Sequence, residues 1–378
     1  MDPAGPIARR FPLVPRPRPA CSSLAARVER ICDLARTAAR SSDLATASAA
    51  CNQAALIASD CGLPDLARQW CQRHADAYLR ARPLDAQAAR YALEPLVNLA
   101  RLHIRDGNGD TAFHLLDTLY EAITSRTDTA IDGILLPASD LTRSSEDHRD
   151  LRRWLWTVHL SDSPRALISA GRWQDALAHL QRHHGIGQRM LDGRQVAVIA
   201  QSTAGDTDGA LKLLEETAPG EPWEQAVTTC LTVLCRPPAR PPAGQDLTAM
   251  LDAYRQFNPG PQLAVFCTRL GLSVIDAAGG AVRPRAHGIA HSLINQVAAS
   301  RDGYAAREVL AHNGCTAILT DDQARELAKI LDHCALGHQK LPGELEAGLS
   351  AALDTSEKVI SRALTAPANA WPDRRRVS

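Results

Sequence analysis

The sequence has 378 residues, enough for two or three ordinary domains or for one extended array of repeats. Its 42 basic and 42 acidic side chains cancel, and the share of hydrophobic residues, 45%, excludes disorder over most of the chain. No apolar run approaches the length of about 18 residues that marks a membrane-spanning helix, so no membrane partner is expected. Alanine and leucine dominate while aromatic residues make up only 4%, which predicts an all-α protein rather than a large sheet.

The neutral total hides an uneven distribution of charge. Residues 1–20 carry four arginines against one aspartate, and the last eight residues carry three arginines against one aspartate. The body between these ends has 35 basic and 40 acidic side chains, so it lacks the concentrated basic face that binds nucleic acid, and no nucleic-acid partner is expected. The 38 arginines against four lysines indicate a GC-rich genome, as in actinobacteria.

The ten cysteines have no C-x-x-C pair and no spacing typical of a zinc site. Prolines and arginines interrupt the start of the chain, which therefore lacks the apolar stretch of a secretory signal. These features predict a cytoplasmic protein with reduced, mostly buried thiols and without a cofactor.

Proline-rich stretches predict the divisions of the chain. Residues 1–20 contain six prolines and are expected to form a disordered, arginine-rich arm. A helical pattern begins at Leu24, with Val28 and Ile31 on the same face. A second proline cluster predicts a linker over residues 236–244, which separates helical regions at 21–235 and 245–366 from each other, and the last expected segment is a basic tail at 367–378.

Four segments of the region 21–235 share one pattern. A helical apolar stretch ends in a glycine, an alanine follows five residues later, and a leucine, or in the first segment Cys71, comes four residues after that. The glycine is expected to end the first helix in a left-handed conformation, and the alanine to lie where two helices cross most closely. The pairs are Gly62–Ala67, Gly107–Ala112, Gly171–Ala176 and Gly205–Ala210.

This pattern resembles the tetratricopeptide repeat (TPR), a helix–turn–helix unit that stacks into a superhelix. Gly171 and Gly205 are 34 residues apart, one full repeat, whereas the wider spacings imply insertions. The tryptophan and tyrosine of the family's first helix are mostly missing, so the resemblance is to a divergent array over roughly residues 46–235. It implies a TPR-like α-solenoid of antiparallel helix pairs, with residues 245–366 as a C-terminal helical extension of further repeats or a capping bundle.

The resemblance also implies a concave groove lined by the first helix of each pair. Amide side chains there would read the backbone of an extended peptide, and arginines would hold carboxylates. The function implied is an adaptor or scaffold for a peptide or protein segment, in a regulatory or natural-product pathway, and a homodimer is compatible with the sequence. The expected groove residues are Asn52, Leu56, Asp60, Glu94, Val97, Asn98, Arg101, Arg105, Arg165, Ser169, Asp192, Gln195 and Ser202.

Residues 127–156 form the longest interruption of the array. Ile131–Pro137 predicts a β-hairpin with Asp132 and Gly133 as its turn, and charged and aromatic side chains follow it. Inserted segments often lie on the binding face of a repeat array. The insertion therefore allows a second function, that of an enzyme or enzyme subunit with its site between the insertion and the groove. A third possible function is a sensor of small ligands or signal peptides. The candidate residues are Asp132, Asp140, His148, Asp150, Arg153, Trp154 and Trp156.

Two histidine pairs have the i, i+4 spacing that can share a metal ion. They are His179 with His183, and His287 with His291. Neither pair has the glutamate that follows the first histidine in zinc proteases, so no metal is expected. Trp173 is expected in the core, because it begins a helix directly after a repeat glycine.

Overall fold

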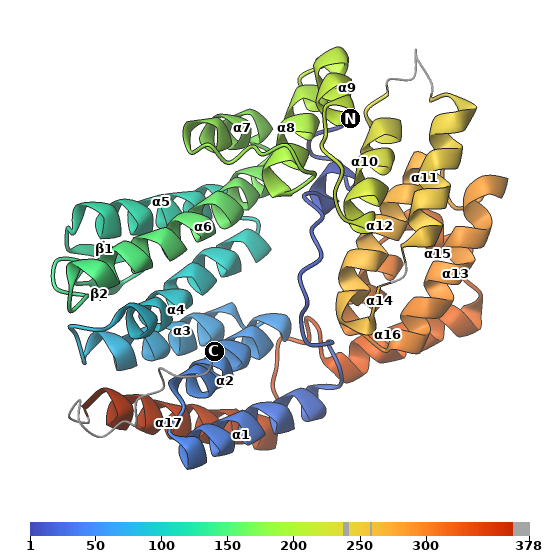
Figure 1. Ribbon diagram of the computed structural model, residues 1–378. Coiled ribbons are helices and arrows are strands. Elements are labelled where there is room, and N and C mark those ends of the chain that lie inside the picture. Colours follow the sequence, from blue (N-terminus) through green and yellow to red (C-terminus); the bar gives the residue numbers. More distant parts are fainter. Residues whose placement is uncertain (237–241, 258, 366–378) are drawn as a thin grey trace, which may run out of the picture. The chain divides into compact units, whose positions relative to one another are not determined.

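The computed structural model describes residues 1–236, 242–257 and 259–365 (Figure 1). Helices make up most of this part of the chain, and its strands form one two-stranded hairpin, which confirms the expected all-α class. The chain divides into two compact units, and each is built from segments distant in the sequence. The first unit comprises Met1–Leu24, Asp106–Phe113 and His159–Leu336, and the second unit comprises Ala25–Arg105, His114–Val158 and Gly337–Ser378.

Helices α2, α3 and α4 of the second unit pack side by side in chain order, each antiparallel to the next (Figure 1). Helix α2 packs on α3, α3 packs on α4, and the C-terminal helix α17 packs on α2 and α3. Helices α5 and α6 pass from one unit into the other. The elements that lie wholly or partly in this unit are α1 (Leu24–Ser41), α2 (Leu44–Asp60), α3 (Pro64–Leu79), α4 (Ala86–Arg105), α5 (Gly109–Ser125), β1 (Thr129–Ile131), β2 (Ile134–Leu136), α6 (Ser145–Ser169) and α17 (Gly343–Thr365).

The first unit contains the remaining helices, which also pack against their neighbours in sequence. Helix α7 packs on α8, α8 on α9, α10 on α11, and α12 on α13. The bounds are η1 (Ala8–Arg10), α7 (Trp173–Arg182), α8 (Asp192–Thr203), α9 (Thr207–Glu215), α10 (Pro222–Leu234), α11 (Gly244–Gln256), η2 (Pro261–Leu263), α12 (Ala264–Ala277), α13 (Pro284–Ser300), α14 (Gly303–Leu310), α15 (Asn313–Thr316) and α16 (Asp321–Cys334).

The glycine–alanine pattern has the structural role expected from the sequence. Each of the four glycines lies between two helices and has a φ angle between 76° and 87°, which a residue with a Cβ adopts only under strain. The four alanines are completely buried, as close helix crossings require. These observations confirm an all-α fold of repeated helix pairs, while the assignment to the TPR type stays a prediction.

The proline-rich linker does not separate the two units. Helices α10 and α11, which flank it, both belong to the first unit and pack against each other. Helix α17, expected in the same C-terminal region as α11, belongs to the second unit because its apolar face is buried there on α2 and α3. Residues 237–241 of the expected linker and the expected basic tail 367–378 lie outside the described residues.

The N-terminal segment differs from the expected disordered arm, because most side chains of residues 8–13 are buried within the first unit. Phe11 and Leu13 are each only 3% exposed, and Arg10 forms an ion pair of 2.7 Å with Asp276. Trp173 is buried as expected, and its Nε1 donates a hydrogen bond to the carbonyl oxygen of Pro3 at 3.0 Å. The prolines exclude a long helix but still allow an extended segment whose apolar side chains enter the core.

The insertion begins with the predicted hairpin. Strands β1 and β2 pair antiparallel, and the two-residue turn between them is Asp132 (φ 48°) and Gly133 (φ 81°). The rest of the insertion contains regular structure rather than one long loop. Leu84 forms a parallel bridge with Thr142, and α6 already begins at Ser145.

Candidate functional site

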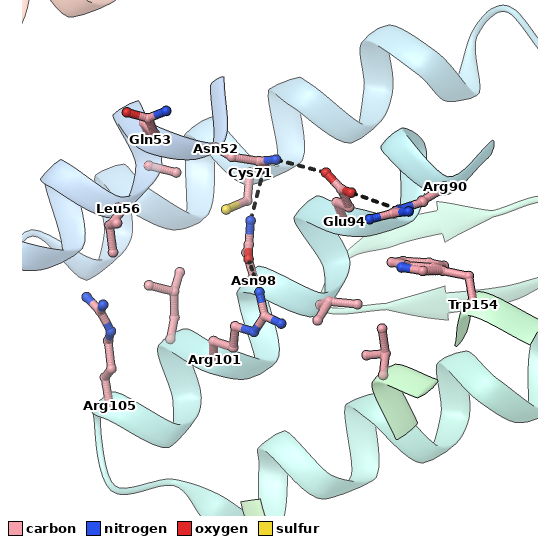
Figure 2. Close-up of a pocket in the computed structure, with 14 residues that line it drawn as sticks. Asn52, Gln53, Leu56, Cys71, Arg90, Glu94, Asn98, Arg101, Arg105 and Trp154 are labelled. Atoms are coloured by element: carbon pink, nitrogen blue, oxygen red, sulfur yellow. Dashed lines mark hydrogen bonds and ion pairs between the residues drawn. The ribbon is translucent and has the colours of Figure 1, made fainter. Parts of the chain in front are cut away.

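The second unit contains a pocket of about 420 Å³ (Figure 2). Helices α2 and α4 supply most of its walls, and α3 and α6 complete them with Cys71, Trp154 and Val158. Both α2 and α4 precede a repeat glycine, so each is the first helix of its pair. The expected groove residues that line this pocket are Asn52, Leu56, Glu94, Val97, Asn98, Arg101 and Arg105.

A continuous chain of hydrogen bonds holds the polar side chains of the pocket (Figure 2). Asn98 Nδ2 donates to Asn52 Oδ1 at 3.0 Å, and Asn52 Nδ2 donates to Glu94 Oε2 at 3.1 Å. At the two ends, Arg101 donates to Asn98 Oδ1 at 3.1 Å, and Arg90 Nε donates to Glu94 Oε1 at 3.2 Å. These bonds fix the side chains before any ligand arrives, which lowers the entropy cost of binding.

Asp60 was expected in the groove, but its side chain lies beneath the pocket wall rather than in it. The residue is 5% exposed, and its carboxylate accepts hydrogen bonds from Arg27 at 2.7 Å and from Arg105 at 3.0 Å. A buried carboxylate is stable only with such partners. Asp60 therefore ties α1, α2 and α4 together and holds Arg105 at the edge of the pocket.

The rest of the lining is apolar and aromatic. The guanidinium of Arg90 lies 5.4 Å from the ring centroid of Trp154, within the range of a cation–π contact. Burial raises the pKa of the Cys71 thiol to about 12, so this thiol is protonated at neutral pH. Leu56 is 39% exposed and gives the pocket an open apolar edge.

The pocket carries a net positive charge. Three arginines line it, Arg90, Arg101 and Arg105, against one acidic residue, Glu94. Guanidinium groups bind carboxylates through paired, charge-assisted hydrogen bonds. Amides, arginines and an aromatic ring around one cavity are the chemistry of a site for an anionic segment of peptide.

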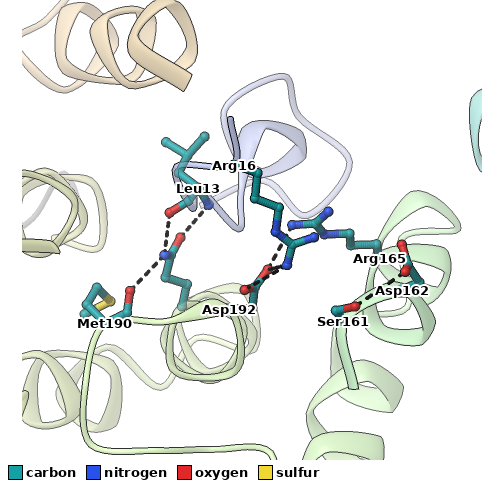
Figure 3. Close-up of polar contacts among 8 residues, drawn as sticks. Leu13, Arg16, Ser161, Asp162, Arg165, Met190 and Asp192 are labelled. Carbon is teal, nitrogen blue, oxygen red and sulfur yellow. Dashed lines mark hydrogen bonds and ion pairs between the residues drawn. The ribbon is translucent and has the colours of Figure 1, made fainter. Parts of the chain in front are cut away.

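Among the groove candidates of the first unit, Asp192 and Gln195 contact the chain's own N-terminal segment, and Arg165 pairs with Asp192 (Figure 3). Asp192 accepts hydrogen bonds from Arg165 at 2.9 Å and from Arg16 at 3.2 Å. Gln195 is completely buried: its Oε1 accepts from the Leu13 amide at 2.6 Å, and its Nε2 donates to the Leu13 carbonyl at 2.8 Å. This face of α8 thus binds an extended backbone through an amide side chain, and that backbone is residues 11–18 of the same chain.

The insertion candidates are dispersed over different contacts. Asp132 lies near Arg68 and His103, Asp140 pairs with Arg82 at 3.1 Å, and Asp150 pairs with Arg153 at 3.3 Å.

The other insertion candidates lie on α6. His148 is buried, and burial together with the nearby charges of Arg126 and Arg152 lowers its pKa. Trp154 lines the pocket, whereas Trp156, 38% exposed, does not. The pocket therefore gathers the groove candidates from α2 and α4, with a single residue from the insertion.

Two charged residues that shape the site were missed at the sequence level, Arg90 in the pocket lining and Arg27 behind it. Arg90 precedes Glu94 by one turn of α4, so it lies on the same helix face as that expected groove residue and could have been predicted with it. Arg27, which pairs with Asp60, comes from α1, before the first repeat glycine. No local pattern indicates that a side chain from α1 reaches α2.

Comparisons with known proteins add little to this geometry. No protein-family model matches the chain, and no curated protein sequence matches it. Among solved structures, it is similar to a protein described as a circular tandem repeat protein with novel repeat topology and enhanced subunit contact surfaces. The two are 13% identical, the alignment covers 89% of this chain and 84% of that chain, and the TM-score is 0.19. At that score the likeness carries no argument, and the all-α fold rests on the helices themselves.

Within the described ranges, none of the helices combines the length and the apolar character needed to cross a bilayer.

Proposed function

We propose that this protein is a TPR-like adaptor whose second unit binds an extended peptide segment carrying a carboxylate. The observation that carries the proposal is the placement of Asn52, Asn98, Arg101 and Arg105 around one pocket. Residues on the first helices of successive pairs meet there, which is how helical-repeat proteins build extended binding surfaces. The cytoplasm suits such an adaptor, because its ten thiols, none in a disulfide, stay reduced there.

Different residues of the pocket would bind different parts of the peptide. Asn52 and Asn98 would exchange hydrogen bonds with the peptide backbone, as Gln195 does with Leu13 in the first unit. Arg101 and Arg105 would hold the carboxylate of an acidic side chain or of a C-terminus. Trp154 and Leu56 would cover an apolar side chain.

Selection from a random peptide library displayed on phage tests this proposal with the full chain as bait. Enriched peptides should carry aspartate or glutamate, and a fluorescent copy of one of them should bind in solution. Asn98→Ala should weaken that binding by about tenfold or more, because it removes the residue that links Asn52 to Arg101. If no peptide is enriched, or if the enriched peptides bind N98A as tightly as the unchanged protein, the proposal fails.

A further inference from the structure

Three histidines meet in the first unit, apart from the pocket described above. His159 comes from α6, His179 from α7, and His183 directly follows α7. Each offers one ring nitrogen, and these three nitrogens all lie within 4.8 Å of one another. The ring centroids are 4.5 to 4.9 Å apart, and Phe113 packs edge-on against His179 at 5.8 Å.

Hydrogen bonds orient two of these rings. His159 Nδ1 lies 3.1 Å from Ser163 Oγ, and His179 Nε2 lies 3.3 Å from the carbonyl oxygen of His159. Histidines that bind metals are typically held in this way, with one nitrogen on a hydroxyl or carbonyl group and the opposite nitrogen on the metal. Coordination at this cluster would use His159 Nε2 and His179 Nδ1.

The cluster is largely buried but open on one side. His159 and His179 are 1% and 3% exposed, and His183 is half-buried, so one side is open to solvent.

We propose that His159, His179 and His183 form a binding site for Zn²⁺. Neutral imidazole nitrogens suit Zn²⁺ and other late transition metals, whereas Mg²⁺ and Ca²⁺ prefer oxygen ligands. Three protein ligands leave the fourth tetrahedral position to a solvent molecule, which can reach it past His183. Zinc–nitrogen bonds of about 2.0 Å place ligand nitrogens about 3.3 Å apart, so small side-chain rotations would close the site.

The proposed site departs from the expectation of no metal, which rested on histidine pairs at i, i+4 spacing and on the missing glutamate of a protease motif. The third ligand lies 20 residues before His179 and on another helix, where i, i+4 spacing cannot reveal it.

A zinc titration tests the site. The full chain, without an affinity tag and freed of metal with a chelator, competes for Zn²⁺ with a chromogenic chelator. We expect one tight equivalent of Zn²⁺, and at least about 100-fold weaker binding by His183→Gln. The matched control is His291→Gln. It removes one member of an i, i+4 pair on α13, whose rings are 4.4 Å apart and which has no third histidine beside it among the described residues. It should leave the tight site unchanged.

His183→Cys makes the test independent of any loss of folding. With Co²⁺ in place of Zn²⁺, a thiolate at residue 183 should add a sulfur-to-cobalt charge-transfer band to the visible spectrum of a tetrahedral site. That band requires direct coordination by residue 183. The proposal is overturned if the unchanged protein binds Zn²⁺ no more tightly than H183Q, if H291Q weakens binding equally, or if H183C with Co²⁺ lacks the band.

Discussion

Gln195 binds both polar groups of the Leu13 backbone, although 182 residues separate the two in the sequence. A single buried amide thus anchors the N-terminal segment to α8. Gln195→Ala removes both bonds and leaves the Leu13 amide and carbonyl without them. We expect the free energy of unfolding to fall by about 1–3 kcal/mol and trypsin to cleave faster after Arg10. Limited proteolysis followed by mass spectrometry measures the second effect.

The control for this variant is Gln181→Ala, at an exposed glutamine of α7 in the same unit. Q181A should leave both the stability and the cleavage rate unchanged. Equal cleavage rates in Q195A and Q181A would show that Gln195 does not anchor the segment.

The buried carboxylate of Asp60 should be essential to the stability of the second unit. Asp60→Asn leaves Arg27 and Arg105 without their shared negative charge, and we expect a loss of about 3 kcal/mol in urea denaturation. Asp65→Asn is the matched control, because Asp65 forms an exposed pair with Arg68 whose removal should cost less than about 1 kcal/mol. Similar losses in the two variants would contradict the structural role of Asp60.

Replacing a repeat glycine should destabilise the protein for conformational reasons alone. Gly171 has a φ of 76°, and no atom lies within 4 Å of the position that a Cβ would occupy. Gly171→Ala should therefore cost about 1 kcal/mol through backbone strain without any clash. Gly288→Ala also enters open space, but within helix α13, so it should stabilise by up to about 1 kcal/mol. Thermal unfolding of both variants checks the prediction, and opposite shifts are expected.

A buried histidine should make the second unit sensitive to acid. His74 is 3% exposed, its Nε2 has no hydrogen-bond partner among the described residues, and burial lowers its pKa to about 3. The unfolded chain takes up a proton on His74 below about pH 6.5, while the folded chain takes it up only near pH 3. The contribution of His74 is therefore fully present above about pH 6.5, and stability is lost as the pH falls towards 3.

The size of this effect is about 1.4 kcal/mol for each pH unit within that window. His74→Leu should flatten the fall in unfolding free energy between about pH 6 and pH 4, measured by urea denaturation. His114→Leu, at an exposed histidine of α5 in the same unit, is the control. If H74L and H114L give the same pH dependence, burial of His74 is not its cause.

Local features of the sequence predicted much of the fold. A left-handed turn at Gly62 or Gly205 and a tight helix crossing at Ala67 or Ala210 depend on nearby residues, so a short pattern reveals them. The hairpin turn at Asp132 is local in the same sense.

Features that depend on distant residues were not predictable. The N-terminal segment is ordered by Asp276 and Gln195, and no pattern within residues 1–20 indicates those partners. Likewise, His159 joins His179 and His183 only because α6 and α7 fold together. The pocket residues of α2 and α4 could be predicted because they recur at helical spacing on one face of each helix. Arg165, Asp192 and Gln195, which were expected in the same groove, lie in the other unit.

The most direct test of the proposed function compares how tightly three proteins bind a selected acidic peptide. Fluorescence polarisation would measure the dissociation constant for the unchanged protein, for Arg101→Glu and for Arg153→Glu. Arg101 lines the pocket, while Arg153 is an exposed arginine of α6 that does not. We expect R101E to weaken binding by at least about tenfold, a peptide with lysine in place of its acidic residue to recover part of that loss, and R153E to have no effect. Equal effects of R101E and R153E, or no effect of either, would contradict peptide binding in this pocket.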